Sequence, residues 1–293
     1  ADAILSFQHA LKLNPRHFDA AYKAGQLLHQ SERFEEALVC FNLCDELEPD
    51  HLPTLHMRAL TLHKLKRFEE ALAGSERALA LDPASVDTCN NIGNILRSLA
   101  RSEEALPWFD RSLELRPNDA MTITSKAVTL VELHRFDEAF AAYRLARVTD
   151  PGCTAAEWNL ALLEMLAGNF EAGWAGREAR WKIPALSFHY PKFSQPMWRG
   201  KEPIDGKTIL INVDEGLGDT IQFSRYVPMV AARGARVILC VQDALCPLLS
   251  ELPGVSQCLP LSTSERPAFD TYCPVSSLPL AFGTKLETIP SAT

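Results

Sequence analysis

The chain has 293 residues, of which 47% are hydrophobic and 23% are charged, a composition typical of about two globular domains. This composition excludes a chain that is disordered, collagen-like or coiled-coil as a whole. The longest uncharged apolar stretch, residues 271–284, is broken by prolines and is too short to cross a bilayer, so we expect no transmembrane segment. The first residues resemble no export signal, and we expect a cytoplasmic protein.

The formal charge of −8 is concentrated in the first part of the chain: residues 1–182 carry 20 basic and 27 acidic side chains, and residues 183–293 carry 9 and 10. Neither part has the basic stripe that binds a phosphate backbone, so we expect no nucleic-acid partner. The eight cysteines form no Cys-x-x-Cys pair and no zinc-type spacing. The sequence therefore predicts neither a disulfide scaffold nor a metal site.

Prolines recur with a period of 34 residues, at Pro15, Pro49, Pro83, Pro117 and Pro151. Alanine repeats with the same period from position 37, and phenylalanine from position 34, with one gap. Apolar residues inside each unit follow helical spacing, so each unit is predicted to be a helical hairpin that ends at its proline. We expect small residues on the first helix to let the two helices approach closely, namely Gly25, Ala59, Gly93, Ala127 and Ala161.

This pattern resembles the tetratricopeptide repeat family. The resemblance implies a right-handed superhelix, and the unbroken proline spacing predicts eleven helices from residue 1 to about 182. A divergent fifth unit places Gly173 where an alanine belongs, and Pro107 should bend or shorten its helix. Residues 1–15 correspond to a second helix alone, so we expect the chain to be a fragment that begins in mid-repeat. The four complete units are 18–51, 52–85, 86–119 and 120–153, followed by 154–182.

In this family the first helices line a concave groove, and polar side chains there contact peptide backbone. The candidate groove residues are a polar stripe in the third complete repeat and two residues in line with it: Asn90, Asn91, Asn94 and Arg97, with Lys23 and Gln26. Amides suit this role because they pair with both donors and acceptors of an extended peptide. The alternative is a merely solvated helix face. A protein or peptide is thus the expected partner of the solenoid.

Residues 183–206 are rich in proline and glycine and form a predicted linker, after which residues 207–293 change character. Aromatic residues between the prolines, including Trp181, Phe188, Tyr190, Phe193 and Trp198, predict that the linker packs against a neighbour. Strands are predicted at 207–213, 236–242, near 256–261 and near 269–275, with helical stretches at 220–233 and 243–252. Alternating strands and helices predict a parallel sheet of Rossmann type.

The glycine-rich turn after the first of these strands is the candidate ligand site, because ligands of open parallel sheets bind beyond the carboxyl ends of strands. The dinucleotide pattern is incomplete at Ile221, so no NAD and no other cofactor is expected. The alternative reading makes Asp219 only a helix cap, in a capping box with Gln222. The candidate site residues are Gly216, Leu217, Gly218, Asp219, Thr220 and Gln222.

This turn, with Ala232–Val237 and Pro279–Thr284, resembles bacterial proteins that join tetratricopeptide repeats to a glycosyltransferase domain similar to heptosyltransferases. The resemblance implies the amino-terminal lobe of a GT-B fold and an inverting, metal-independent transfer in which Asp219 is the general base. It also implies that a nucleotide-sugar donor binds only to a carboxyl-terminal lobe beyond Thr293, so we expect this fragment to be inactive.

Two functions therefore remain open. The first is a glycosyltransferase-like protein whose solenoid recruits a protein partner or acceptor. The alternative is a non-catalytic adaptor or scaffold that mediates protein–protein interaction.

Overall fold

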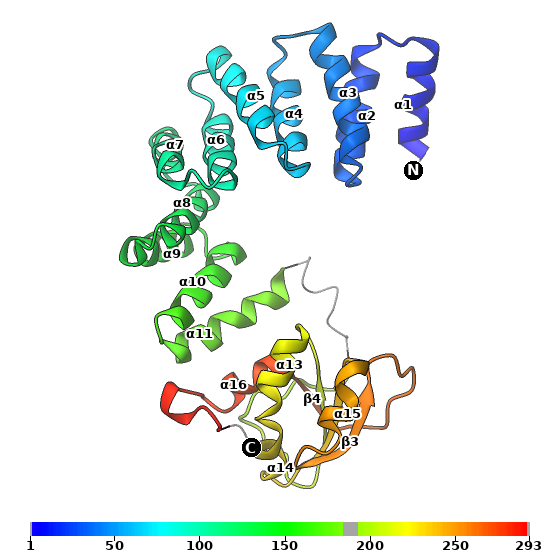
Figure 1. Ribbon diagram of the computed structural model, residues 1–293, viewed down its shortest axis with the longest axis vertical. Coiled ribbons are helices and arrows are strands. Elements are labelled where there is room, and N and C mark those ends of the chain that lie inside the picture. The colour runs from blue at the N-terminus through cyan, green and yellow to red at the C-terminus, as the bar shows by residue number, and fades with distance from the viewer. Residues whose placement is uncertain (1, 184–192, 292–293) are drawn as a thin grey trace. The chain divides into compact units, whose positions relative to one another are not determined.

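The structure, a computed structural model, describes residues 2–183 and 193–291 (Figure 1). The chain divides into two compact units, which we call unit 1 (residues 1–156) and unit 2 (residues 157–293). This boundary falls inside the first helix of the fifth hairpin, so most of that hairpin belongs to the same compact unit as the sheet. Within the described residues, no helix is long and apolar enough to cross a membrane.

Eleven α-helices span residues 2–177 of the described chain, as the repeat spacing predicts. The first helix stands alone and five pairs follow, with first helices of 13 residues and second helices of 14 residues in the four complete hairpins. Their bounds are α1 Asp2–Leu13, α2 Phe18–Gln30, α3 Phe34–Leu47, α4 Leu52–Lys64, α5 Phe68–Leu81, α6 Val86–Ser98, α7 Ser102–Leu115, α8 Ala120–Glu132, α9 Phe136–Thr149, α10 Thr154–Leu166 and α11 Phe170–Arg177.

Helix ends explain why the hairpins repeat so regularly. Ser85 and Asp119 accept hydrogen bonds from backbone amides in the first turns of α6 and α8, which would otherwise lack a partner. A tight turn to the second helix follows each of these first helices, and one residue of that turn lies two positions beyond the helix end. The residue in that turn has a left-handed backbone, with φ between 57° and 59°, at Glu32, Lys66, Ala100 and His134. None of these is glycine, so sequence propensity alone does not reveal the turn.

Phenylalanine rings of the second helix lie against the small residues of the first helix. A Cβ atom at Gly25 would lie 2.7 Å from the ring of Phe41, and one at Gly93 would lie 2.7 Å from the ring of Phe109. The two glycines therefore make room for the phenylalanine rings of the paired helix. Pro107 does not shorten its helix, because α7 has the same 14 residues as α3 and α5.

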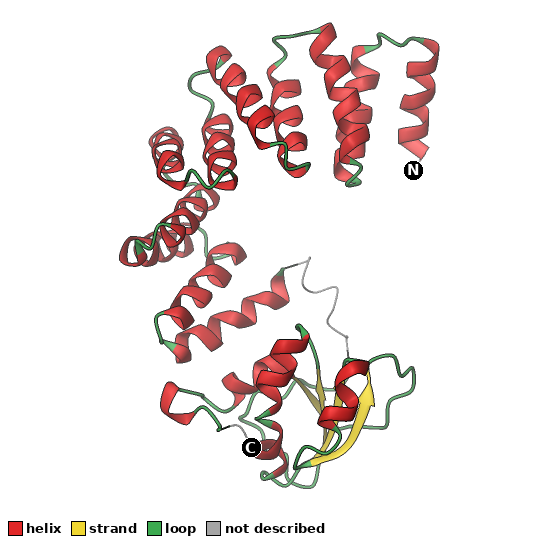
Figure 2. Ribbon diagram, viewed as in Figure 1, coloured by secondary structure: helices red, strands yellow, loops and turns green. Residues whose placement is uncertain are grey.

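Unit 2 contains a four-stranded parallel sheet in the order β3-β2-β1-β4 (yellow in Figure 2). The strands are β1 Thr208–Asn212, β2 Arg236–Val241, β3 Val255–Pro260 and β4 Thr271–Pro274, close to the predicted positions. The predicted helical stretches are each divided in two. The short helices of the unit are η1 Glu178–Lys182, α13 Leu217–Ser224, α14 Val227–Ala231, η2 Asp243–Leu245, α15 Cys246–Leu249, η3 Val275–Ser277, α16 Leu278–Ala281 and η4 Leu286–Thr288.

The two faces of the sheet are covered differently. Alternate residues of β1, Ile209 and Ile211, belong to a large core together with α11, α13, α14 and α16. On the other face, Leu210 packs in a smaller cluster with loop aromatics, among them Phe193 and Phe269. The expected packing of the linker is therefore confirmed for Phe193 and also for Trp198, which is 1% exposed. Phe188 and Tyr190 lie outside the described residues.

Candidate functional site

The first helices of the hairpins in unit 1 form a continuous inner row. Helix α2 contacts α4, α4 contacts α6, and α6 contacts α8, in addition to the contacts inside each hairpin. Side chains join this row from one hairpin to the next: the His29 and His56 rings lie 2.9 Å and 2.5 Å from the hydroxyls of Thr61 and Thr88. Burial lowers the pKa of both histidines, so these rings act as neutral hydrogen-bonding groups near neutral pH.

Helix α6 carries the predicted polar stripe, and its four residues are all half-buried. The side-chain amide of Asn94 donates to the backbone carbonyl of Asn90 at 3.0 Å, and Arg97 lies 3.6 Å from the carboxylate of Glu132 on α8. Asn91 has no hydrogen-bond partner in the described part of the chain. Asn91 is therefore the amide of this stripe that is free to bind a partner.

The second part of the predicted groove lies on α2 and is not joined to the stripe. Lys23 donates to Gln26 at 3.4 Å, so these two residues are close to each other. Helix α4 stands between α2 and α6, and it places Met57 and Leu60 at the equivalent positions. These two apolar side chains of α4 thus divide the polar surface into two patches, one on α2 and one on α6.

Sequence reasoning missed two cations of the inner row. Arg58 donates to Asn42 at 2.7 Å, and Lys126 lies 2.5 Å from the carboxylate of Asp110. Both cations occupy the same position of their repeats, and each acceptor precedes its cation by 16 residues. This shared spacing was a signal that the sequence contained.

In unit 2, the predicted site turn begins helix α13 earlier than expected. The helix starts at Leu217, so Asp219 occupies its third position, and its carboxylate accepts the backbone amide of Gly216 at 3.2 Å. Asp219 therefore caps the helix from within its first turn, and the box with Gln222 that the sequence suggested does not form.

The other predicted residues of this turn are mostly exposed. Gly216, Leu217, Gly218 and Gln222 face solvent, and a Cβ at Gly218 would meet no atom within 4 Å. Thr220 is buried, and its hydroxyl bonds to the carbonyl of Gly216 and to Gln242, each at 3.0 Å. The turn thus has an open outer side and an anchored inner side.

A cluster of buried charged side chains lies next to this turn, at the carboxyl ends of β1 and β4. The guanidinium of Arg180, from η1, is 1% exposed and donates to Asp214 at 3.2 Å and to Glu178 at 2.6 Å. Asp214 also accepts the hydroxyl of Ser276 at 2.5 Å. Burial raises the pKa of Asp214, and Arg180 opposes that rise. Sequence reasoning did not identify this cluster.

A second arginine ties α11 to the same turn. Both oxygens of Glu215 accept from one nitrogen of Arg177, at 2.5 Å and 2.6 Å. The guanidinium of Arg177 also lies 5.6 Å and 5.7 Å from the ring centroids of Trp174 and Phe223. Side chains of the last repeat hairpin therefore lie at the carboxyl ends of the strands, where open parallel sheets bind ligands.

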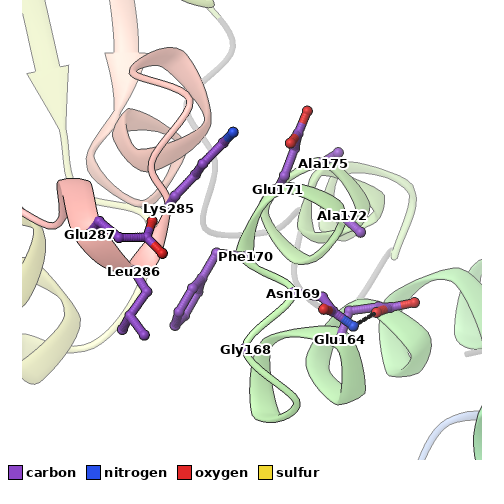
Figure 3. A pocket seen from close by; sticks show the side chains of 10 residues that line it. All are labelled: Glu164, Gly168, Asn169, Phe170, Glu171, Ala172, Ala175, Lys285, Leu286 and Glu287. Carbon is purple, nitrogen blue, oxygen red and sulfur yellow. Dashed lines mark hydrogen bonds between the residues drawn. The ribbon is translucent and has the colours of Figure 1, made fainter.

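An open pocket of about 790 Å³ lies elsewhere in unit 2, between the α10–α11 turn and η4 (Figure 3). Phe170 and Leu286 provide apolar walls, and Lys285 and Glu171 extend from opposite sides of it. None of the residues predicted from the sequence lines this pocket.

Comparison with protein-family models identifies tetratricopeptide repeats in the helical part of the chain. Residues 52–85 and 86–119 match a tetratricopeptide repeat model, and residues 1–40 match a second tetratricopeptide repeat model. No curated protein sequence matches the chain.

Two solved structures share the fold of the helical part of the chain. TTC0263 from Thermus thermophilus, a thermophilic TPR protein, is 18% identical with a TM-score of 0.53, and the match covers 58% of this chain and 93% of that one. PilW, a type IV pilus biogenesis factor, is 20% identical with a TM-score of 0.52, covering 56% and 76%. At this identity the likeness shows the fold alone, and the helical part of the chain is a solenoid of tetratricopeptide repeats.

Proposed function

We propose that the protein is an adaptor whose inner row binds an extended peptide segment of a partner protein. The observation that carries this proposal is the free side-chain amide of Asn91 on α6, flanked by the half-buried side chains of Asn90, Asn94 and Arg97. An amide without an internal partner can donate to and accept from a peptide backbone. The alternative named from the sequence, a protein-binding adaptor, thus has more support than a sugar transferase.

The charges of unit 1 indicate which peptides fit. The inner row, α2, α4, α6 and α8, carries five Lys or Arg residues and three Asp or Glu residues. The second helices, α3, α5, α7 and α9, carry four Lys or Arg residues and 13 Asp or Glu residues. The solenoid is therefore mildly basic on the row that holds Asn91 and strongly acidic on the other row. Charge complementarity favours an acidic partner segment on the inner row.

We expect the double substitution Asn91→Ala and Asn94→Ala to weaken binding of an acidic peptide by about 1–3 kcal/mol in total. The melting temperature should fall only slightly, because the Asn91 side chain makes no internal hydrogen bond in the described residues and the Asn94 amide bonds only to Asn90 within α6. The measurement is fluorescence anisotropy with two labelled peptide pools of equal length, one acidic and one basic, in which the order of residues is random.

Asn118→Ala is the matched control, because Asn118 is an exposed asparagine in the turn before α8. This control should bind the acidic peptides as the parent does. Equal binding by the double variant, or a preference of the parent protein for basic peptides, would contradict the proposal.

The sheet of unit 2 supports a second candidate function, sugar transfer. The order β3-β2-β1-β4, with the exposed glycine turn at the carboxyl end of the central strand β1, is the arrangement expected for half of a Rossmann-type lobe. A transferase of the GT-B type, with Asp219 as general base, therefore stays a prediction. The hydrogen bond from Gly216 to Asp219 favours the capping role instead.

Asp219→Asn separates the two roles. An asparagine oxygen still accepts the Gly216 amide, so capping and stability should be preserved, whereas a general base would lose about 10²–10⁴ in rate. The measurement is sugar transfer from a panel of nucleotide-sugars by the protein in its complete encoded length. A parental rate in Asp219→Asn would exclude the catalytic role, and Asp219→Ala should cost about 1 kcal/mol of stability through the lost cap.

A further inference from the structure

Two thiols of unit 2 lie against each other at the edge of the sheet. Cys246 is the first residue of α15, Cys258 lies in the edge strand β3, and their Sγ atoms are 3.5 Å apart. Both residues are half-buried, so a small reagent can reach them. This contact joins two elements that are separated in sequence by the turn at Pro253 and Gly254.

The register of the sheet determines which cysteines can pair. Cys258 stands opposite Leu239 on β2, and both belong to the core on the helix-covered face, where Cys246 also packs. Cys240, the next residue of β2, is 1% exposed and belongs to the cluster on the opposite face. The sheet therefore separates Cys240 from the Cys246–Cys258 contact and leaves one pair.

We propose that Cys246 and Cys258 are an oxidative modification site that forms an intramolecular disulfide by exchange with a small-molecule disulfide such as oxidised glutathione. A disulfide needs an Sγ–Sγ distance of about 2.05 Å, and side-chain rotation of Cys246 at the first residue of α15 supplies the remaining approach. The bond closes the loop between α15 and β3 and fastens the edge strand of the sheet to α15.

The exchange proceeds in two steps that balance. The Cys246 thiolate attacks one sulfur of oxidised glutathione, forms a mixed disulfide and releases one glutathione thiolate, which takes up a proton. Cys258 then loses its proton and attacks the Cys246 sulfur, which forms the intramolecular bond and releases the second glutathione as a thiol. Two protein thiols are oxidised, and one glutathione disulfide is reduced to two thiols.

The surroundings of the two sulfurs support this order of attack. Burial, together with the neighbouring Cys246 thiol, raises the pKa of Cys258 to about 12. Cys258 is therefore protonated near neutral pH and is a poor first nucleophile. Once Cys246 carries glutathione, the adjacent sulfur is the nearest target for Cys258, so the second step is intramolecular.

The test incubates the folded protein with oxidised glutathione, blocks the remaining thiols with an alkylating agent, and maps the linked peptides by mass spectrometry. We expect a mass loss of about 2 Da before alkylation, with a peptide that joins Cys246 to Cys258. In Cys246→Ser the linked peptide should disappear, and in Cys258→Ser a glutathione adduct should accumulate on Cys246.

Cys40→Ser is the matched control, because Cys40 is also half-buried but lies on α3 of unit 1. This variant should form the Cys246–Cys258 bond at the parental rate. Complete alkylation of both cysteines after prolonged incubation, or a linkage that involves Cys240 instead, would overturn the proposal. Reduction of the bond by excess thiol should restore the parental mass.

Discussion

Replacing Arg180 with methionine is expected to lower the free energy of unfolding of unit 2 by about 3–5 kcal/mol. The variant removes the guanidinium but leaves Asp214 and Glu178 in a site where the side chain of Asp214 is 0% exposed. A buried carboxylate without its cation bears the full cost of lost hydration. Tryptophan fluorescence during urea unfolding measures this change, because four of the five tryptophans lie in unit 2.

The effect should depend on pH with a defined sign. Burial raises the pKa of Asp214 in the folded protein, and the loss of Arg180 raises it further. A carboxyl group with a raised folded pKa favours the folded state below its unfolded pKa, and that contribution is lost as the pH rises through the folded pKa. The deficit of Arg180→Met should therefore be larger at about pH 7.5 than at about pH 5.

Two further variants decide whether charge or shape is responsible. Adding Asp214→Asn to Arg180→Met removes both charges of the Arg180–Asp214 pair, keeps an acceptor for Ser276 and leaves only Glu178 charged. The double variant should therefore recover part of the lost stability and reduce the pH dependence. Arg135→Met is the exposed control, since Arg135 pairs with Glu138 at the surface of unit 1 and should change stability little. A deficit that is the same at both pH values would contradict a charge origin.

The hairpins of unit 1 could be predicted from the sequence because each packing position recurs every 34 residues. Proline, alanine and phenylalanine series fix the helix ends and the buried faces without knowledge of the fold. The turns between paired helices could not be predicted, because Glu32, Lys66 and Ala100 adopt a left-handed backbone that their side chains do not favour. Gly168, at the equivalent place of the fifth hairpin, is the one member with the usual residue type.

The candidate sites were predictable only where local pattern determines them. The glycine turn and the strands around it follow from local composition, and the amides of α6 follow from helical spacing. The pairing of Arg180 with Asp214 links residues from a helix and a strand end, and no periodic feature of the sequence connects them. Long-range pairs of buried charges depend on the assembled core. Only the structure therefore reveals that arginines from the end of the last repeat lie at the carboxyl ends of the strands.

The second large effect is expected for Trp174→Ala, which should destabilise unit 2 by about 3–5 kcal/mol. Trp174, on α11, is 6% exposed and belongs to the same core as Ile209 and Ile211 of β1. Its ring packs edge-on against Phe223 of α13 at 5.8 Å between centroids. Removal of the indole leaves a cavity between the last repeat hairpin and the sheet, which the surrounding helices can fill only in part.

Hydrogen exchange with mass spectrometry locates this loss. If hairpin and sheet share one core, peptides from α11 and from β1 should lose protection together in Trp174→Ala, while peptides from α2–α5 of unit 1 keep theirs. Trp174→Phe is the matched control: it keeps an aromatic ring and removes an indole nitrogen that has no hydrogen-bond partner in the described residues, so its cost should be much smaller. Unchanged protection of β1 in Trp174→Ala would show that the sheet folds without the hairpin, and the repeat boundary at 182 would then also be a boundary of stability.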